Sequence, residues 1–255
     1  MDRGLGACAP ARWIGARERA RAGMDPRQTS VLYANSGRLP LASRLSWRAR
    51  IRVYGLFMTV CVPEPHESIL DVGVTSDTRF AESNFLERLY PYKDRITCVG
   101  TEDGSHLERE YPGLRFVGEA PGGRLPFADA QFRIAFSNAV IEHVGSRDRQ
   151  RAFVAEMLRV AERVFIVTPN RWFPFELHTG LPLLHYLPAT AFRSILRQTR
   201  YRFWAEEANL NLLTKEDVRR LFPSDVQPRL LLTGVGLERI RSKVAAYAVS
   251  RGRSS

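Results

Sequence analysis

The sequence has 255 residues and very little cysteine, with only Cys8, Cys61 and Cys98. Three scattered cysteines fit neither a disulfide framework nor a zinc site, and they favour a reducing compartment, which we take to be the cytoplasm. Long apolar runs are also missing, because the longest, from Leu56 to Val62, falls far short of the roughly 20 residues that span a bilayer. With 44% hydrophobic and 25% charged residues, the composition excludes collagen-like, disulfide-scaffold and wholly disordered proteins.

Lysine is nearly absent, since the 38 basic residues include only Lys93, Lys215 and Lys243 and are otherwise arginine. The formal net charge is +11, but it is unevenly distributed. Residues 1–55 hold 11 arginines against three acidic residues, whereas residues 56–255 hold 27 basic and 24 acidic side chains. Because the body of the protein is nearly neutral and has no aromatic–basic motif, we expect no nucleic-acid partner.

The N-terminal residues 1–41 are basic and show no periodicity, so we predict a disordered arm. A basic, acid-poor start also suits a transit peptide, and Met24 is an alternative to Met1 as the initiator. Within residues 42–62, Leu45 and Ile51 recur at helical spacing with later apolar residues among arginines, which predicts an amphipathic helix. We expect this helix to pack on the next domain as a lid. A basic amphipathic helix also suits peripheral contact with a membrane or a partner helix.

Residues 63–255 alternate short apolar strands with helices, a pattern typical of βαβ units and a parallel sheet covered on both faces. The expected strands lie at 68–72, 95–99, 115–117, 132–136 and 164–167, and the expected helices at 80–90, 105–111 and 148–161. Two further strands, at 229–232 and 244–250, suit an antiparallel pair at one edge of the sheet. Thr214 and Asp217 are spaced as a helix N-terminal capping pair.

Polar residues follow the strands at the edge where ligands bind in such sheets. In strand order they are Asp71 and Gly73, Glu102 and Asp103, Glu119 and Ala120, and Ser137 and Asn138. The G-x-G-x-x-G fingerprint is missing, which argues against a pyrophosphate site at a helix N-terminus. Successive acids without a phosphate loop suit a ribose diol and a cationic group, as in S-adenosylmethionine (SAM). The alternative is that these acids only cap helices.

Four segments in this region resemble the successive motifs of class I SAM-dependent methyltransferases, particularly the methyltransferase type 11 group. They are ILDVGVTSD (69–77), RFVGEA (115–120), LPFADAQFRIAFSNAVIEHV (125–144) and RVFIVTPN (163–170). The resemblance implies an α/β, Rossmann-like, seven-stranded and mostly parallel sheet, with helices on both faces and an antiparallel C-terminal edge strand. The chain departs from the family in having only Gly73 where three glycines are usual, and Arg133 where an Asp is usual.

The resemblance also implies the cofactor, SAM, and the residues that hold it. Asp71 and Gly73 would contact the methionine part, and either Glu102 or Asp103 would bind the ribose hydroxyls. Glu119 with Ala120 would border the adenine, and Ser137 with Asn138 would line the floor of the site. The implied reaction is an in-line displacement on the activated methyl group, which chiefly requires that the acceptor be held collinear and close.

The acceptor side of the site is predicted from histidines and aromatic residues. His143 follows the fourth strand, where it is a candidate general base for a hydroxyl acceptor. An insertion at about 170–215 is rich in proline and aromatic residues, which predicts a loop or lid over the acceptor. From it we select Trp172, Phe173, His178 and His185 as acceptor-binding residues. The alternatives are that these side chains pack within the lid or form a dimer contact, and that His143 packs in a turn.

We predict no metal site, because Glu142 and His143 form only a half-site without a second pair at suitable spacing. The preferred function is a methyltransferase that O-methylates a small molecule. The basic helix favours an alternative with a lipid-linked acceptor at a membrane surface. The missing glycines favour another, a degenerate methyltransferase fold that only binds. No motif identifies the acceptor or an oligomeric state.

Overall fold

The computed structural model describes residues 40–78, 80, 82–118, 123–237 and 240–250. The last two residues of the predicted arm therefore belong to the first described helix, while residues 1–39 of that arm, including the choice between Met1 and Met24, lie outside the described residues. Two predicted adenine-site residues, Glu119 and Ala120, also lie outside them.

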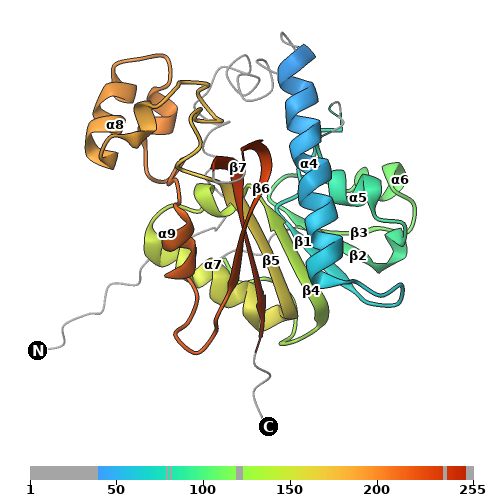
Figure 1. The fold of residues 1–255 in the computed structure, drawn as a ribbon. Helices are drawn as coiled ribbons and strands as arrows, with labels where there is room; N and C mark the ends of the chain where they lie inside the picture. The colour runs from blue at the N-terminus through green and yellow to red at the C-terminus, as the bar shows by residue number, and fades with distance from the viewer. Residues whose placement is uncertain (1–39, 79, 81, 119–122, 238–239, 251–255) are drawn as a thin grey trace, which may run out of the picture.

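The described residues form a single seven-stranded sheet with the order β3-β2-β1-β4-β5-β7-β6 (Figure 1). Its strands are β1 (Ile69–Val72), β2 (Ile96–Gly100), β3 (Arg115–Gly118), β4 (Phe132–Asn138), β5 (Ala161–Pro169), β6 (Arg229–Leu237) and β7 (Ile240–Val249). Strands β1 to β5 pair in parallel, while β7 runs antiparallel to both β5 and β6. The predicted fold class is confirmed. The order reverses between β1 and β4, which is where such sheets bind ligands.

Helices cover both faces of the sheet (Figure 1). They are α4 (Pro40–Cys61), α5 (Phe85–Leu89), α6 (Leu107–Glu110), α7 (Arg147–Val160), α8 (Ala189–Arg197) and α9 (Lys215–Arg219). Alternate residues of each strand point to opposite faces, so β1 contributes to two cores. Ile69 packs with α4 and α5, and Leu70 packs with α7.

The helix predicted over 42–62 is present as α4, but its packed face differs from the predicted one. Leu45 and Ile51 are each 40% exposed, whereas Val53, Phe57 and Cys61 are buried against the sheet. The ring of Phe57 meets those of two sheet phenylalanines edge-on, with centroids 5.2 and 5.5 Å apart. A residue every four positions forms a stripe on a helix. The face of α4 that packs on the sheet is therefore the one that carries Phe57, whose ring fits between side chains of the sheet.

The helix predicted over 80–90 is shorter in the structure, beginning only at Phe85. The preceding residue, Asn84, has a left-handed backbone (φ 49°), which breaks the helix at that point. Thr214 and Asp217 form the predicted capping box at the start of α9.

Most of the insertion after β5 is irregular as far as Pro188, and α8 follows from Ala189. The insertion has its own small core, built from Phe192, Leu196, Tyr201, Trp204, Ala205 and Leu210. In Figure 1 it lies beyond the carboxyl end of β5, at the upper left. None of the described helices is both long and apolar enough to cross a bilayer.

Candidate functional site

The turn after β1 requires glycine at position 73. Gly73 has φ +105°, and a Cβ atom there would lie 2.2 Å from Cγ2 of Val140. The Gly73 amide donates to the carbonyl of Val99 at 2.8 Å. Val140 reaches this position because Ala139, directly after β4, has a left-handed backbone (φ 56°). Gly73 therefore brings the ends of β1, β2 and β4 together at the point where the strand order reverses.

Asn84 holds the same turn, and the sequence analysis did not select it. Its side chain accepts a hydrogen bond from the Thr75 amide (3.1 Å) and donates one to the Thr75 carbonyl (2.8 Å). Asn84 is buried and has the left-handed backbone that asparagine tolerates better than most residues. No sequence signal pointed to this role, because Asn84 lies inside the helix predicted over 80–90.

The structure separates the two candidate acids after β2. Ser76, in the turn after β1, donates a hydrogen bond from Oγ to Oε2 of Glu102. Asp103 instead accepts from the Ser105 amide at 2.9 Å. Hydrogen bonds from the backbone and side chain of Ser105 lower the pKa of Asp103. Glu102 therefore faces the β1 turn, while Asp103 caps its own loop.

Asp71 is buried next to a second acid, Glu87 of α5, which is fully buried. Burial, then the charge of Glu87 and a hydrogen bond with it, raise the pKa of Asp71 well above its usual range. The thiol of Cys98 donates to Oε1 of Glu87 at 3.1 Å. The Asp71 carboxyl thus belongs to a buried acid pair below the cofactor edge, an arrangement that the sequence analysis did not foresee.

The two residues at the end of β4 differ in their contacts. Ser137 is buried and donates from Oγ to the Val72 carbonyl (2.9 Å), so it joins β4 to β1. Oδ1 of Asn138 is buried without a hydrogen-bond partner among the described residues. A buried acceptor left unpaired costs about 1–3 kcal/mol. Asn138 therefore presents an amide that a ligand can satisfy at the switch between β1 and β4.

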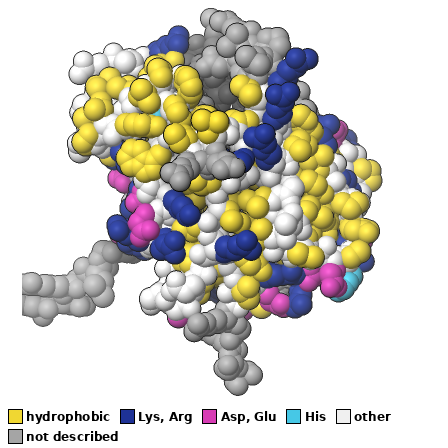
Figure 2. All heavy atoms as spheres, viewed as in Figure 1, with side chains coloured by type: hydrophobic (Ala, Val, Ile, Leu, Met, Phe, Trp, Pro, Cys, Tyr) yellow, Lys and Arg dark blue, Asp and Glu magenta, His cyan; other side chains and the backbone are white. Residues whose placement is uncertain are grey.

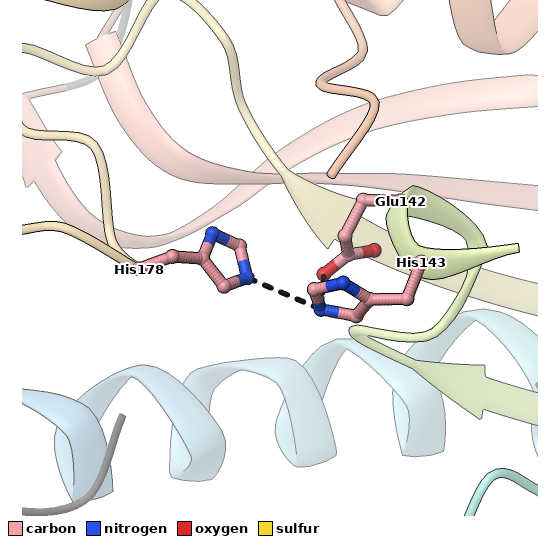
Figure 3. A group of neighbouring side chains, drawn as sticks. All are labelled: Glu142, His143 and His178. Carbon is pink, nitrogen blue, oxygen red and sulfur yellow. Dashed lines mark hydrogen bonds and ion pairs between the residues drawn. The ribbon is translucent and has the colours of Figure 1, made fainter. Parts of the chain in front are cut away.

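His143 and His178 meet in the structure, although they are far apart in the sequence. His143 lies in the 3₁₀ turn η2 (Ile141–His143), and His178 lies in the insertion (Figure 3). Their Nε2 atoms are 3.2 Å apart, and the two rings meet edge-on. Trp204 packs against both rings, with centroids 5.9 and 4.9 Å away.

The remaining ring nitrogens fix the tautomers of this pair. Nδ1 of His143 lies 2.7 Å from the Asn209 carbonyl, which only accepts, so this nitrogen carries the hydrogen. Nδ1 of His178 lies 2.6 Å from Oε1 of Glu176 and donates to that carboxylate. With Nδ1 committed in each ring, Nε2 is the nitrogen that faces the other ring.

Glu176 is the buried anchor of His178. Its carboxylate also accepts hydrogen bonds from the amides of His178 and Thr179 and from the Thr179 hydroxyl. Burial alone would raise the pKa of Glu176, but the charge and hydrogen bonds of His178 and Thr179 outweigh it and lower the pKa to about 2. The His178 ring is therefore held by a carboxylate that stays charged at neutral pH.

Glu142 lies beside the histidine pair and is fully buried. Its Oε2 accepts from Thr168 Oγ1 at 2.9 Å, and its Oε1, 3.8 Å from Nε2 of His143, has no hydrogen-bond partner among the described residues. Lys243 of β7 is a further buried group that the sequence analysis missed. Burial and the charge of Arg50 lower its pKa to about 7, against the opposing effect of Glu142.

The other predicted acceptor-side residues do not join this cluster. Nε2 of His185 donates to the Phe173 carbonyl at 2.8 Å, within the insertion. Trp172 is 49% exposed and packs against the ring of Tyr186. The structure thus brings His143 and His178 together, and places His185, Phe173 and Trp172 on a separate part of the insertion.

Comparison with known proteins gives no match to a family model and none to a curated protein. Solved structures do match. A SAM-dependent methyltransferase of Thermotoga maritima has a TM-score of 0.52 and 14% identity over 94% of this chain and 99% of that one. The plantazolicin methyltransferase BamL, solved in complex with a triazolic desmethylPZN analog and S-adenosylhomocysteine (SAH), has a TM-score of 0.53 and 11% identity over 93% and 94% of the two chains.

A third match is the complex of the Haloferax volcanii Trm112 methyltransferase activator with a methyltransferase. It has a TM-score of 0.54 and 11% identity, and covers 89% of this chain and 98% of the matched one. These identities are too low to transfer a substrate, but the strand order and the extent of the matches agree. This chain has the fold of the class I SAM-dependent methyltransferases.

Proposed function

We propose that this protein is a SAM-dependent methyltransferase that acts in the cytoplasm and O-methylates a small molecule. The observation that carries the proposal is the position of Glu102, a carboxylate at the end of β2 that is hydrogen-bonded to Ser76 of the glycine turn after β1. In a sheet of this strand order, that position borders the crevice where ligands bind.

The donor set around this crevice fits SAM. Glu102 offers carboxylate oxygens to a ribose diol, and the Gly73 turn brings backbone close to the strand switch. Asn138 offers an amide to the methionine part, which carries both an ammonium and a carboxylate group. Asp71 and Glu87 add a buried acid pair under the same edge. Ser137 supports this floor through the β1 backbone.

Bound SAM supplies an electrophilic methyl group. The chain must hold the acceptor oxygen in line with it and receive the hydroxyl proton. We assign proton acceptance to Nε2 of His143, because its Nδ1 hydrogen is committed to Asn209. His178 lies next to that nitrogen and stabilises the protonated ring by sharing its hydrogen. Trp204 and the insertion cover the pair and limit access of water.

Calorimetric titration of the full-length chain with SAH tests the proposal. We expect one SAH per chain. Glu102→Gln should weaken binding about tenfold, the loss that about 1.4 kcal/mol represents. Asp103→Asn is the matched control, since asparagine also caps the Ser105 amide, and it should bind within about twofold of wild type. A folded wild-type protein that binds neither SAM nor SAH would refute methyl transfer and leave a degenerate, binding-only fold.

A second candidate function, methylation of a lipid-linked acceptor, is favoured by the surface around the insertion. Phe175 and Leu183 are each 54% exposed, and Figure 2 shows hydrophobic side chains gathered over the insertion and basic ones along the upper part of α4. Arg44 and Arg48 are exposed on that helix. Apolar side chains beside arginines suit the surface of an anionic membrane. Flotation with phosphatidylserine vesicles tests this second function. Equal recovery of the protein in the floating fraction with and without vesicles would rule it out.

A further inference from the structure

We propose that Glu142, His143 and His178 form a binding site for one divalent transition-metal ion of the zinc type. One ligand atom from each residue lies within 4.8 Å of the others, and all three residues are buried. Figure 3 shows the ring of His178 facing that of His143, with the Glu142 carboxyl beside the latter. The site stands on this geometry alone; only its catalytic use rests on the proposed methyl transfer.

The orientation of both rings is the first argument. Metal-binding histidines usually donate their second ring N–H to a carboxylate or a backbone carbonyl, which fixes the tautomer and turns the other lone pair toward the metal. His178 donates from Nδ1 to Glu176, and His143 donates from Nδ1 to the carbonyl of Asn209. Each histidine therefore already has a hydrogen-bond acceptor for its second ring N–H. The acceptor is a carboxylate for His178 and a backbone carbonyl for His143.

The distance between the two Nε2 atoms is the second argument. Two nitrogens bound to zinc at 2.0–2.1 Å in tetrahedral geometry are about 3.3 Å apart. Nε2 of His143 and Nε2 of His178 are 3.2 Å apart. Because Nδ1 carries the hydrogen in both rings, the two Nε2 atoms face each other at that distance with no hydrogen assigned between them. A shared cation, either a metal ion or a proton, would bridge them.

The third ligand separates a metal ion from a proton. Glu142 Oε1 is buried, lies 3.8 Å from Nε2 of His143 and has no hydrogen-bond partner among the described residues. A shared proton between the rings would leave this oxygen unpaired, whereas a metal ion would bind it. Oε2 of Glu142 is meanwhile held by Thr168, which fixes the carboxyl as a hydrogen bond fixes a metal-binding carboxylate.

The surrounding charges permit a cation. Two carboxylates lie at the histidine pair: Glu142 beside Nε2 of His143, and Glu176 at Nδ1 of His178. The opposing groups are Lys243 and Arg50. Two carboxylates thus stand against two basic groups around the site.

Three protein ligands leave a coordination position for a substrate oxygen, as in catalytic zinc sites. In methyl transfer, the metal would lower the pKa of a bound acceptor hydroxyl, which loses its proton to solvent. The resulting oxygen forms a bond to the methyl carbon while the C–S bond of SAM breaks, which leaves SAH. In the metal-bound form His143 is thus a ligand, and the proton acceptance assigned to its Nε2 applies to the metal-free form.

The test uses untagged, full-length protein stripped with a chelator and dialysed, then titrated with ZnCl₂ by calorimetry and with CoCl₂ by visible absorption. We expect one ion per chain with a micromolar or lower Kd, and cobalt ligand-field bands that zinc abolishes. His178→Gln should weaken binding at least tenfold. His185→Gln is the matched control, a buried histidine of the same insertion that bonds only to backbone, and it should leave binding within about twofold.

Circular dichroism and SAH titration on the same samples show that each variant is folded and has a cofactor site. If His178→Gln fails to fold, Glu142→Gln takes its place, with the same expected loss. Stripped wild type that binds neither ion below 100 μM overturns the metal site, as does equal loss in the two histidine variants. Zinc binding without SAH binding supports the metal site and refutes the methyl transfer. SAH binding without zinc binding supports the methyl transfer and refutes the metal site. It indicates that the two histidines share a proton instead.

Discussion

Replacing Gly73 with alanine should destabilise the protein and distort the cofactor edge. The new Cβ would lie 2.2 Å from Cγ2 and 3.3 Å from Cγ1 of Val140, and φ +105° is unfavourable for any residue with a Cβ. Backbone strain of this kind costs about 1–3 kcal/mol. Relieving the overlap with Val140 by local repacking costs about 1–3 kcal/mol more. We therefore expect Gly73→Ala to lower the free energy of unfolding by about 2–6 kcal/mol.

Urea denaturation of four proteins separates these two contributions. Adding Val140→Ala removes both methyl groups that the new Cβ would meet, so the double variant should lose at least about 1 kcal/mol less than the sum of the single variants. Gly55→Ala is the control, because Gly55 is exposed within α4 and has no atom within 4 Å of a Cβ; this change should stabilise by about 0.5–1 kcal/mol. If Gly73→Ala is as stable as Gly55→Ala, or if the double variant shows additive losses, the packing argument is wrong.

Two buried ionisable groups whose pKa values are lowered in the folded state should each make stability rise with pH, in two separate pH ranges. Glu176 has a folded-state pKa of about 2 against 4.5 for the free group, so its stabilisation of about 3 kcal/mol is present above about pH 5 and is lost as the pH falls toward 2. In urea titrations, the stability difference between wild type and Glu176→Gln should narrow over that range, and a constant difference would contradict the assignment. Lys243 has a folded-state pKa of about 7 against 10.5, so wild-type stability should rise between about pH 7 and 10.5. Lys243→Met should remove this rise and stabilise the protein at pH 7 by a few kcal/mol; an unchanged slope would show that the amine is not buried.

The sheet was predictable from the sequence because its strands are short apolar runs that alternate with amphipathic segments. The helix from Arg147 to Val160 follows the same rule, since its apolar residues recur at helical spacing and are the ones that the structure buries. The predicted helix boundaries were wrong where a single residue overrides the spacing of apolar residues. Asn84 delays the start of the predicted 80–90 helix to Phe85, because its side chain is committed to the Thr75 backbone of a different loop.

The cofactor edge was only partly predictable, because local sequence does not show where a carboxyl points. Glu102 and Asp103 are adjacent and chemically alike, yet one bonds to the turn after β1 and the other to its own loop. Asp71 was expected to face a ligand, but the position of its carboxyl depends on Glu87, which reaches it from α5. Lys243 has no local signal other than being a charged residue in an apolar strand.

The pairing of His143 with His178 depends on the insertion and could not be predicted from the spacing of either residue. The insertion supplies His178 and Glu176, and it also supplies Asn209, whose carbonyl orients His143 from the other side. Trp204, part of the insertion's own small core, packs against both rings. The sheet side of the site contributes Glu142 and His143, which follow β4, and Thr168 of β5, which holds Glu142. The insertion therefore determines the tautomers of both histidines as well as covering them, so displacing it would separate the rings and release both Nδ1 hydrogens together.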